Sequence, residues 1–276
     1  MNPFPRICGG AADPAAVRAD LLEFHATHPG ITEATIGTCV TGSGHTGYDI
    51  LADQLEPDHR VVADLGAGNG PLLDRLAGLP HLTRIIGVDG CAEELGRVRT
   101  RDPRVELRAD LPAGLDAVLS HHAFYLFQPP EPVIEGLARA VRPGGLFAWV
   151  STSGRTGEHP VYVEMLTRMA ERVSRAVPHF SGWGDRRQWT RTGRDALFAG
   201  SAWAPLVEKD FVLILREPPD QIVDRLLGFF YSAWLCDREE LRVAWTALLP
   251  PGPDGLAVLE WPWTVVSARR TGDLET

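Results

Sequence analysis

The sequence predicts an α/β protein built on a parallel sheet, and three observations support that prediction. The β-branched run Val61–Leu65 leads into a glycine-rich turn, and a helical pattern follows over Pro71–Ala77. A second apolar run, 85–88, ends at an acid, and a third, 115–120, leads into a polar turn. Runs of strand length that alternate with helical patterns are typical of βαβ units in a parallel sheet.

The turn Gly66-Ala67-Gly68-Asn69-Gly70 is the most informative stretch of the chain. Glycine accepts positive φ, so the backbone turns sharply and approaches a ligand closely. The turn opens onto a helix N-terminus, whose free N–H groups attract polar or negative atoms. We therefore expect a nucleoside-carrying ligand at the end of the first strand. A dinucleotide is disfavoured, because Pro71 stands where that fingerprint has its third glycine.

Acidic residues follow the next two strands. Asp89 ends the second strand and lies 23 residues after Gly66, near the offset of about 20 at which an acid meets a ribose in such folds. A carboxylate suits a ribose because it accepts hydrogen bonds from both vicinal hydroxyls. Asp110 lies near the end of the third strand, 105–111. The alternative for both acids is an ordinary residue at a strand end, and for the glycine turn a loop that binds nothing.

The stretch D-L-G-A-G-N-G, which starts at Asp64, resembles motif I of class I S-adenosylmethionine-dependent methyltransferases. The order of strand, polar turn, helix, R-P-G-G stop and strand over residues 115–151 resembles the fourth and fifth strand region of the same superfamily. Together the signals span about residues 58–152. The resemblance implies a Rossmann-like seven-stranded, mostly parallel sheet with a helical cap.

The same resemblance implies S-adenosyl-L-methionine as the cofactor. Asp89 would hold its ribose, Asp110 would accept a hydrogen bond from the adenine amino group, and Leu111 would pack against the ring. The residues expected to bind the cofactor are Asp64, Gly66, Ala67, Gly68, Asn69, Asp89, Gly90, Asp110, Leu111, Ser120 and His121.

His121 and His122 are the candidates for acid–base work. They stand at the carboxyl end of the fourth strand, where the transferred methyl group should lie, and histidine takes a proton near neutral pH. The alternative is that His121 only contacts the cofactor while His122 packs inward. Tyr48 and Tyr231 are the other catalytic candidates, with hydrophobic packing as their alternative. No metal is expected, because side chains alternate along a strand and the two histidines cannot face one ion.

The chain divides into three parts. Residues 1–57 are expected to form an N-terminal helical lid, with helices at 13–28 and 48–55 and a Thr/Gly-rich connection at 31–47. Residues 58–154 form the S-adenosylmethionine-binding Rossmann-like core, in which helix 132–141 precedes strand 146–151. Residues 155–276 supply cap helices and the last strands. In this last part we expect helices at 160–177, 219–235 and 237–249, an aromatic loop at 180–189, and strands at 206–217 and 258–268.

Composition limits the partners. The net charge is −9, with a single lysine and no basic block, which disfavours a nucleic-acid substrate. The four cysteines form no CxxC pair, so neither a zinc site nor a disulfide framework is indicated. No apolar run approaches the length of a membrane span, and no secretory signal is recognisable. We expect a cytoplasmic protein with a small-molecule substrate, and we leave open a homodimer formed by exchange of the N-terminal helix.

The expected function is methyl transfer from S-adenosylmethionine to an O, N or C nucleophile of a small molecule, in specialised-metabolite biosynthesis. A second hypothesis keeps the fold and changes the reaction: the cofactor's own amine attacks its Cγ, which yields azetidine-2-carboxylate and methylthioadenosine. Segment 25–51, with H-P-G and G-H-T-G-Y-D, has a faint resemblance to azetidine-2-carboxylate synthases. A third hypothesis is a non-catalytic cofactor-binding regulatory protein.

Overall fold

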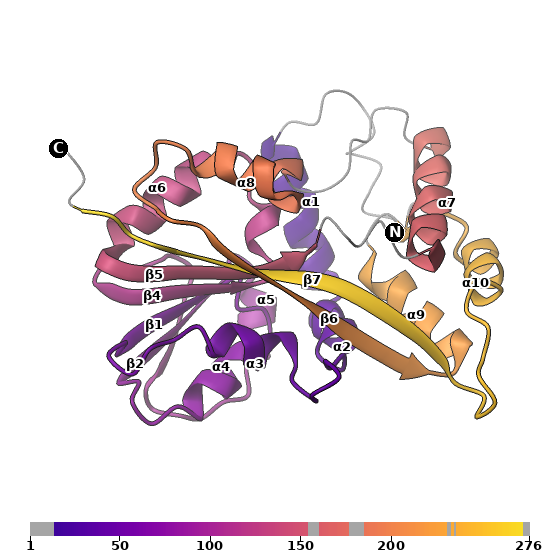
Figure 1. Cartoon of the computed structure of the whole chain (residues 1–276), viewed down its shortest axis with the longest axis horizontal. Helices are drawn as coiled ribbons and strands as arrows, with labels where there is room; N and C mark the ends of the chain where they lie inside the picture. The colour runs from indigo at the N-terminus through magenta and orange to yellow at the C-terminus, as the bar shows by residue number, and fades with distance from the viewer. Residues whose placement is uncertain (1–13, 154–159, 177–184, 231–232, 235, 273–276) are drawn as a thin grey trace.

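Seven strands form one sheet in the order β3-β2-β1-β4-β5-β7-β6 in the computed structural model (Figure 1). The structure describes residues 14–153, 160–176, 185–230, 233–234 and 236–272. Strands β1 to β5 pair in parallel, and β7 runs antiparallel to β5 and β6. The predicted fold class is therefore confirmed. The strands are β1 Val61–Leu65, β2 Arg84–Val88, β3 Val105–Arg108, β4 Leu115–His121, β5 Val141–Thr152, β6 Val207–Glu217 and β7 Ala257–Arg269.

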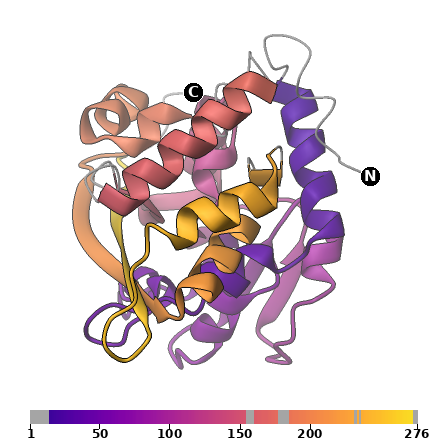
Figure 2. The same cartoon turned by 90° about the vertical axis from the view of Figure 1, so that its right-hand side faces the viewer.

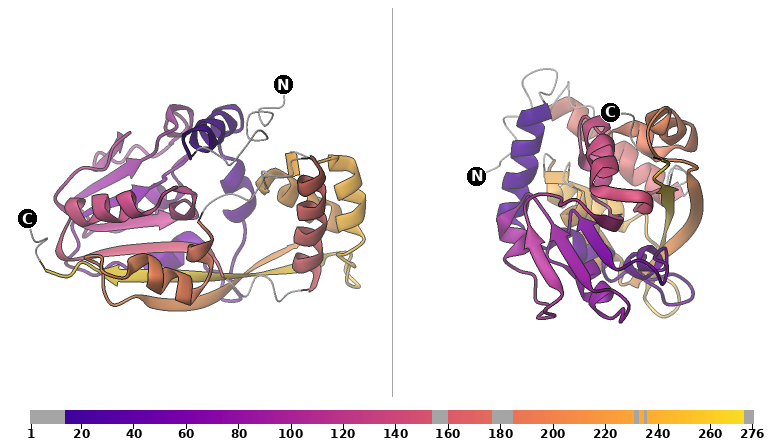
Figure 3. Two further views of the ribbon diagram at one scale, coloured as in Figure 1. Left: turned by 90° about the horizontal axis from the view of Figure 1, so that it is seen from above. Right: turned by 90° about the vertical axis from the view of Figure 1, so that its left-hand side faces the viewer.

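Helices cover both faces of the sheet and the end at which its parallel strands finish. Helices α3 and α4 lie on one face and α6 and α8 on the other, as Figure 1 and Figure 3 show. Helices α7, α9 and α10 gather beyond the carboxyl ends of the parallel strands, with α1 at their side (Figure 2). This group forms the predicted helical cap. The helices are α1 Pro14–Thr27, α2 Ile31–Ile36, α3 Gly47–Ala52, α4 Pro71–Ala77, α5 Ala92–Leu95, α6 Glu131–Ala140, α7 Pro160–Ala176, α8 Arg191–Phe198, α9 Pro219–Phe229 and α10 Arg238–Thr246.

Strand alternation builds a separate apolar core on each face of the sheet. In β5, Ala148 and Val150 belong to the core beneath α3 and α4, whereas Phe147 and Trp149 belong to the core beneath α6 and α8. Trp149 is fully buried and stacks on Phe198 of α8, with ring centroids 5.2 Å apart. Burying an aromatic side chain of this size contributes roughly 1.5–3 kcal/mol to stability. The core beneath α6 and α8 therefore stabilises the packing of α8 on the sheet.

The cap shares its core with the sheet. Helices α9 and α10 are inserted between β6 and β7, whose register runs from Val207↔Ser267 to Glu217↔Ala257. Leu226 of α9 and Trp245 of α10 are fully buried in the core that also contains Trp263 of β7. Among the residues described, no helix is long and apolar enough to cross a membrane.

Several local predictions were wrong. The predicted connection 31–47 contains α2, which is too short for an apolar stripe and is held by packing: Thr35 Oγ1 donates to the carbonyl of Arg225 in α9 at 3.0 Å. The third strand ends at Arg108, before Asp110, and the helix expected over 219–235 ends at Phe229. Helices α5 and α8 were not predicted at all. In such short segments, tertiary contacts override weak local propensity.

A buried ion pair joins α8 to β6. The guanidinium of Arg194 donates to both carboxylate oxygens of Glu208 at 2.8 and 2.7 Å, and its Nη1 donates to the carbonyl of Gln188 at 2.7 Å. The side chains are only 3% and 12% exposed. The guanidinium of Arg194 and the carboxylate of Glu208 are thus fully paired with each other and with the Gln188 carbonyl. Removal of either side chain would leave the other as an unpaired buried charge.

Replacing Arg194 by methionine should lower the free energy of unfolding by about 3 kcal/mol, because Glu208 would lose its partner in a buried site. Urea unfolding monitored by tryptophan fluorescence measures this change. The matched control is Arg216→Met, which breaks the exposed pair with Asp254 and should cost less than about 1 kcal/mol. Equal losses in the two variants would contradict a structural role for the buried pair.

Candidate functional site

The glycine turn lies between β1 and α4 and is tied to the end of β2. The N–H groups of Gly66 and Ala67 donate to the carbonyl of Val88 at 2.8 and 3.0 Å. Gly66 and Gly68 have positive φ values of 79° and 53°, which glycine adopts without steric cost. A Cβ on Gly66 would clash with the Cβ of Ala123. The turn therefore requires glycine both for its conformation and for its close approach to the segment after β4.

Asp89 is fixed beside this turn by two backbone hydrogen bonds. Its Oδ2 accepts from the N–H of Gly68 at 2.9 Å, and its Oδ1 accepts from the N–H of Cys91 at 2.8 Å. Each carboxylate oxygen keeps a second lone pair for another donor. The half-buried carboxylate is thus oriented in advance, and it is able to accept hydrogen bonds from a pair of vicinal hydroxyls.

Asp64, at the end of β1, is an almost completely buried acid. It is 1% exposed, and its Oδ1 accepts no hydrogen bond from any residue that the structure describes. Burial, followed by the negative charges of Asp89 and Glu33, raises its pKa well above the ordinary value of an aspartate. An unpaired carboxyl oxygen in such a place is costly, and it marks where a polar or cationic ligand group would be stabilised.

Glu33, on α2, is a site residue that the sequence analysis missed. Its Oε1 lies over the glycine turn, 3.0 Å from where a Cβ on Gly68 would stand. Burial raises its pKa to about 7, with a further contribution from the neighbouring acids Glu94 and Asp89. The residue lies in a short Thr/Gly-rich segment without periodicity, so no local signal in the sequence marks it.

The N-terminal segment is clamped over the site through Glu94 of α5. The N–H of Gly30 lies 3.1 and 3.0 Å from the two carboxylate oxygens of Glu94, and His25 Nδ1 lies 2.9 Å from Oε1. Glu94 itself is only 2% exposed. Gly30 also lies against the turn, because a Cβ there would stand 2.8 Å from Asn69 Nδ2. The end of α1 and the start of α2 are thus held against the glycine turn.

His121 ends β4 on the same face of the sheet as Asp64. Its ring lies 4.0 Å from that of Tyr48, centroid to centroid, so these two predicted residues are neighbours. A Cβ on Gly47 would stand 2.5 Å from Nε2 of His121, so α3 packs closely on the imidazole. Burial lowers the pKa of His121 to about 3, and its Nε2 has no partner in the part of the chain that is described. The imidazole is therefore neutral at physiological pH.

His122 adopts a left-handed backbone conformation, φ 52°, which is unusual for a residue with a side chain. Its N–H donates to the carbonyl of Val150 at 2.9 Å, which fixes the turn after β4. Its Nε2 lies 3.1 Å from the hydroxyl of Tyr125, and its ring lies 4.8 Å from that of Trp263 and 5.1 Å from that of Phe229. Burial lowers its pKa as well. The sequence pattern did not place Tyr125 or Trp263 at the site.

The predicted adenine end of the site is more open than the end near Asp64. Asp110 and Gly90 are exposed, and Leu111 is half-buried. Ser120 is fully buried, and its hydroxyl donates to the carbonyl of Leu65 at 2.8 Å, so it braces β4 against β1. Tyr231, the remaining catalytic candidate, lies outside the described residues.

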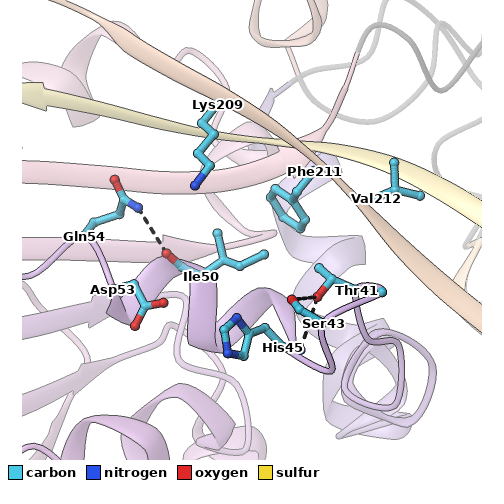
Figure 4. A pocket seen from close by; sticks show the side chains of 10 residues that line it. Thr41, Ser43, His45, Ile50, Asp53, Gln54, Lys209, Phe211 and Val212 are labelled. Carbon is cyan, nitrogen blue, oxygen red and sulfur yellow. Dashed lines mark hydrogen bonds between the residues drawn. The ribbon is translucent and has the colours of Figure 1, made fainter.

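A cavity in the described part of the chain lies away from these residues. It has a volume of about 500 Å³ and sits between the start of α3 and the outer strand β6. Figure 4 shows Lys209 pointing toward Ile50 and Gln54, with His45 at the opposite side. None of the residues predicted to bind the cofactor lines it. The cavity is therefore separate from the candidate site.

The half-buried carboxyl group of Glu33, on α2, makes the free energy of unfolding depend on pH. Because the pKa of Glu33 is about 7 in the folded chain and 4.5 as its ordinary value, its contribution to stability is full below about pH 4.5 and is lost as pH rises through 7. Between pH 5 and pH 8 the wild type should lose about 2 kcal/mol more stability than Glu33→Gln, after allowance for partial exposure. Urea titrations at several pH values measure this; the exposed Glu23→Gln should follow the wild type. Parallel curves for wild type and Glu33→Gln would contradict the burial of this carboxyl.

The central part of this chain is similar to known sequences. Residues 63–149 match the model of a methyltransferase domain family. A segment of 106 residues is 33% identical to trans-aconitate 2-methyltransferase from Azoarcus sp. (strain BH72). The aligned segment covers 36% of this chain and 42% of that protein. The chain thus aligns with less than half the length of this curated relative.

Comparison with solved structures agrees on the fold. A putative type II methyltransferase from Anaeromyxobacter dehalogenans superposes with a TM-score of 0.55 at 19% identity, over 82% of this chain and 96% of that one. A phosphoethanolamine N-methyltransferase from Haemonchus contortus, solved with S-adenosylhomocysteine, gives a TM-score of 0.54 at 15% identity, over 95% of this chain and 61% of that one. The glycine turn and the acid that follows it thus lie within a segment, residues 63–149, that matches a methyltransferase domain, on a fold shared with solved methyltransferases.

Proposed function

We propose that the protein transfers the methyl group of S-adenosylmethionine to an O, N or C nucleophile of a small molecule, in specialised-metabolite biosynthesis. The observation that carries the proposal is the glycine turn held by Asp89 inside a methyltransferase domain. Net charge −9 without a basic block supports a small-molecule partner rather than a nucleic acid. A cytoplasmic location is part of the same proposal.

The residues present fit the proposed cofactor. Asp64 offers a buried carboxyl oxygen without a partner in the described chain, which suits the ammonium group at the amino-acid end of S-adenosylmethionine. Asp89 offers two oriented oxygens to the ribose hydroxyls, and the backbone of the turn leaves no room for side chains at Gly66. Asp110 and Leu111 remain the candidates for the adenine.

The bound cofactor supplies a methyl group made electrophilic by its sulfonium. The chain's task is to align the acceptor behind that group and to exclude water, since positioning supplies much of the rate of a displacement. Tyr125, Phe229 and Trp263 present aromatic rings beside His122. Aromatic faces attract a cationic centre, so these rings suit a position near the sulfonium.

The histidines favour particular acceptors. A neutral His121 with a pKa of about 3 accepts a hydrogen bond well but is a weak base, because efficient proton removal needs a pKa near the working pH. His122 is likewise held neutral by burial. An acceptor that is nucleophilic without prior loss of a proton, such as a neutral amine, therefore suits this site better than an alcohol.

A second candidate reaction is favoured by the acids beneath α2. In cyclisation of S-adenosylmethionine, its amine forms a bond to its own Cγ, the Cγ–S bond breaks, and methylthioadenosine leaves with the electron pair. The amine must be free of its extra proton, and Glu33 with a pKa of about 7 is suited to receive a proton at neutral pH. The products would be azetidine-2-carboxylate and methylthioadenosine.

Replacing Asp89 by asparagine should weaken the binding of S-adenosylhomocysteine by at least about tenfold, because charged hydrogen bonds to the ribose would be lost. Isothermal titration calorimetry measures the affinity. Asp74→Asn, an exposed change on the neighbouring helix α4, is the matched control and should bind as the wild type does. Unchanged affinity in a folded Asp89→Asn protein would show that the ribose lies elsewhere.

Incubation of the purified protein with S-adenosylmethionine alone, followed by mass spectrometry, tests the proposed reaction. A methyltransferase should leave the cofactor intact until an acceptor is supplied, and a panel of small amines should then yield S-adenosylhomocysteine and a methylated product. Methylthioadenosine together with azetidine-2-carboxylate would replace methyl transfer by cyclisation. Binding without turnover across the panel would favour the non-catalytic regulatory role.

A further inference from the structure

Three carboxyl groups from three separate elements converge on the glycine turn. Asp64 ends β1, Asp89 follows β2, and Glu33 stands on α2. Glu33 Oε1 lies beside Gly68, and the N–H of Gly68 donates to Asp89. Electrostatic coupling links Glu33 with Asp89, and Asp64 with both. The acids therefore share one small volume beneath the N-terminal segment.

The charged groups that act on Asp64 and Glu33 are mostly acids, and the guanidinium of Arg18 reaches only the edge of this volume, beside Gly90. The charged groups that act on Asp64 are both acids, and its Oδ1 has no hydrogen-bond partner in the described chain. The other groups that face Glu33 are the acid Glu94, the phenol of Tyr48 and the imidazole of His25, which itself contacts Glu94. Asp64 is almost fully enclosed, and its Oδ1 has no partner in the described chain. This points to a cationic ligand group, because buried charges are stable only when they are paired.

We propose that Glu33 binds the α-ammonium group of the cofactor's amino-acid end from α2, which is already held over the glycine turn. This inference rests on the proposed function, since it assigns a residue of this chain to a cofactor of the superfamily. Asp64 would contact the same ammonium from the sheet side, and Glu33 from the lid side. Ligands without the amine would leave both acids unpaired.

The lid is built to hold Glu33 at this place. Gly30 donates to Glu94 of α5, and Thr35 donates to the carbonyl of Arg225 in α9. Arg225 is in turn paired with Glu217 at 2.6 Å. Both ends of α2 are thus anchored, and the carboxyl group between them is directed at the turn rather than at solvent.

Protonation supports the same assignment. Burial holds the pKa of Glu33 near 7, so the group is mostly protonated at pH 6 before any ligand binds. An arriving ammonium favours the charged carboxylate and lowers that pKa. Binding at pH 6 should therefore release a proton from Glu33.

Three adenosine ligands separate recognition of the amine from a general packing role of Glu33. S-adenosylhomocysteine carries both amine and carboxylate, 5′-(3-aminopropylthio)adenosine carries only the amine, and 5′-methylthioadenosine carries neither. By calorimetry at pH 7.5, Glu33→Gln should weaken the first two by about tenfold and should change the third by less than about twofold. Glu23→Gln, an exposed change on α1, is the control and should bind all three as the wild type does.

A second readout is independent of affinity. Titration with S-adenosylhomocysteine at pH 6 in buffers of different ionisation enthalpy gives the number of protons released, which should be smaller in Glu33→Gln than in the wild type. Equal weakening of all three ligands would show that Glu33 only packs the lid, and no weakening of any would place it away from the amine; either result overturns the inference. If the wild type binds none of the three, the proposed function fails and the inference fails with it.

Discussion

The structure depends on the hydrogen bonds that join the glycine turn to the end of β2. The carbonyl of Val88 holds the start of the turn, and the carboxylate of Asp89 holds its middle through Gly68. These bonds fix the direction in which α4 leaves the sheet. Leu72 and Leu73 of α4 then lie in the core beneath α3 and α4. They also set where Asp64 stands relative to Asp89. The same few bonds therefore support both the packing of the domain and the geometry of its site.

Three of the unsatisfied polar groups lie together at one edge of this sheet. Asp64, His121 and His122 each have a buried side-chain atom without a partner in the described structure, and each such group costs about 1–3 kcal/mol. His122 adds a left-handed backbone, which costs a further 1–3 kcal/mol or so. The two apolar cores offset these costs. Departures of this kind are typical of functional sites, and here they lie where the parallel strands end.

The sequence predicted those parts of the molecule that depend on local pattern. The glycine turn, the strand before it and Asp89 are close in the chain, so composition and spacing alone identified them. Glu33 escaped prediction because it meets the turn only after α2 folds back over more than thirty residues. Tyr125 was not predicted as a site residue for a related reason. Its contact with His122 depends on the left-handed backbone conformation of His122, for which the sequence has no local signal. Tyr231 remains a prediction.

The insertion of α9 and α10 into the β6–β7 hairpin has a consequence for how this protein evolves. Both ends of the insertion leave an antiparallel ladder that is continuous as far as Glu217 and Ala257. A longer, shorter or unrelated insertion at that point would leave the ladder closed and the parallel half of the sheet untouched. Under the proposed function, the cap near the acceptor is then open to replacement by recombination, while the half that holds the cofactor is inherited unchanged. Divergence in acceptor preference would accumulate at this hairpin tip.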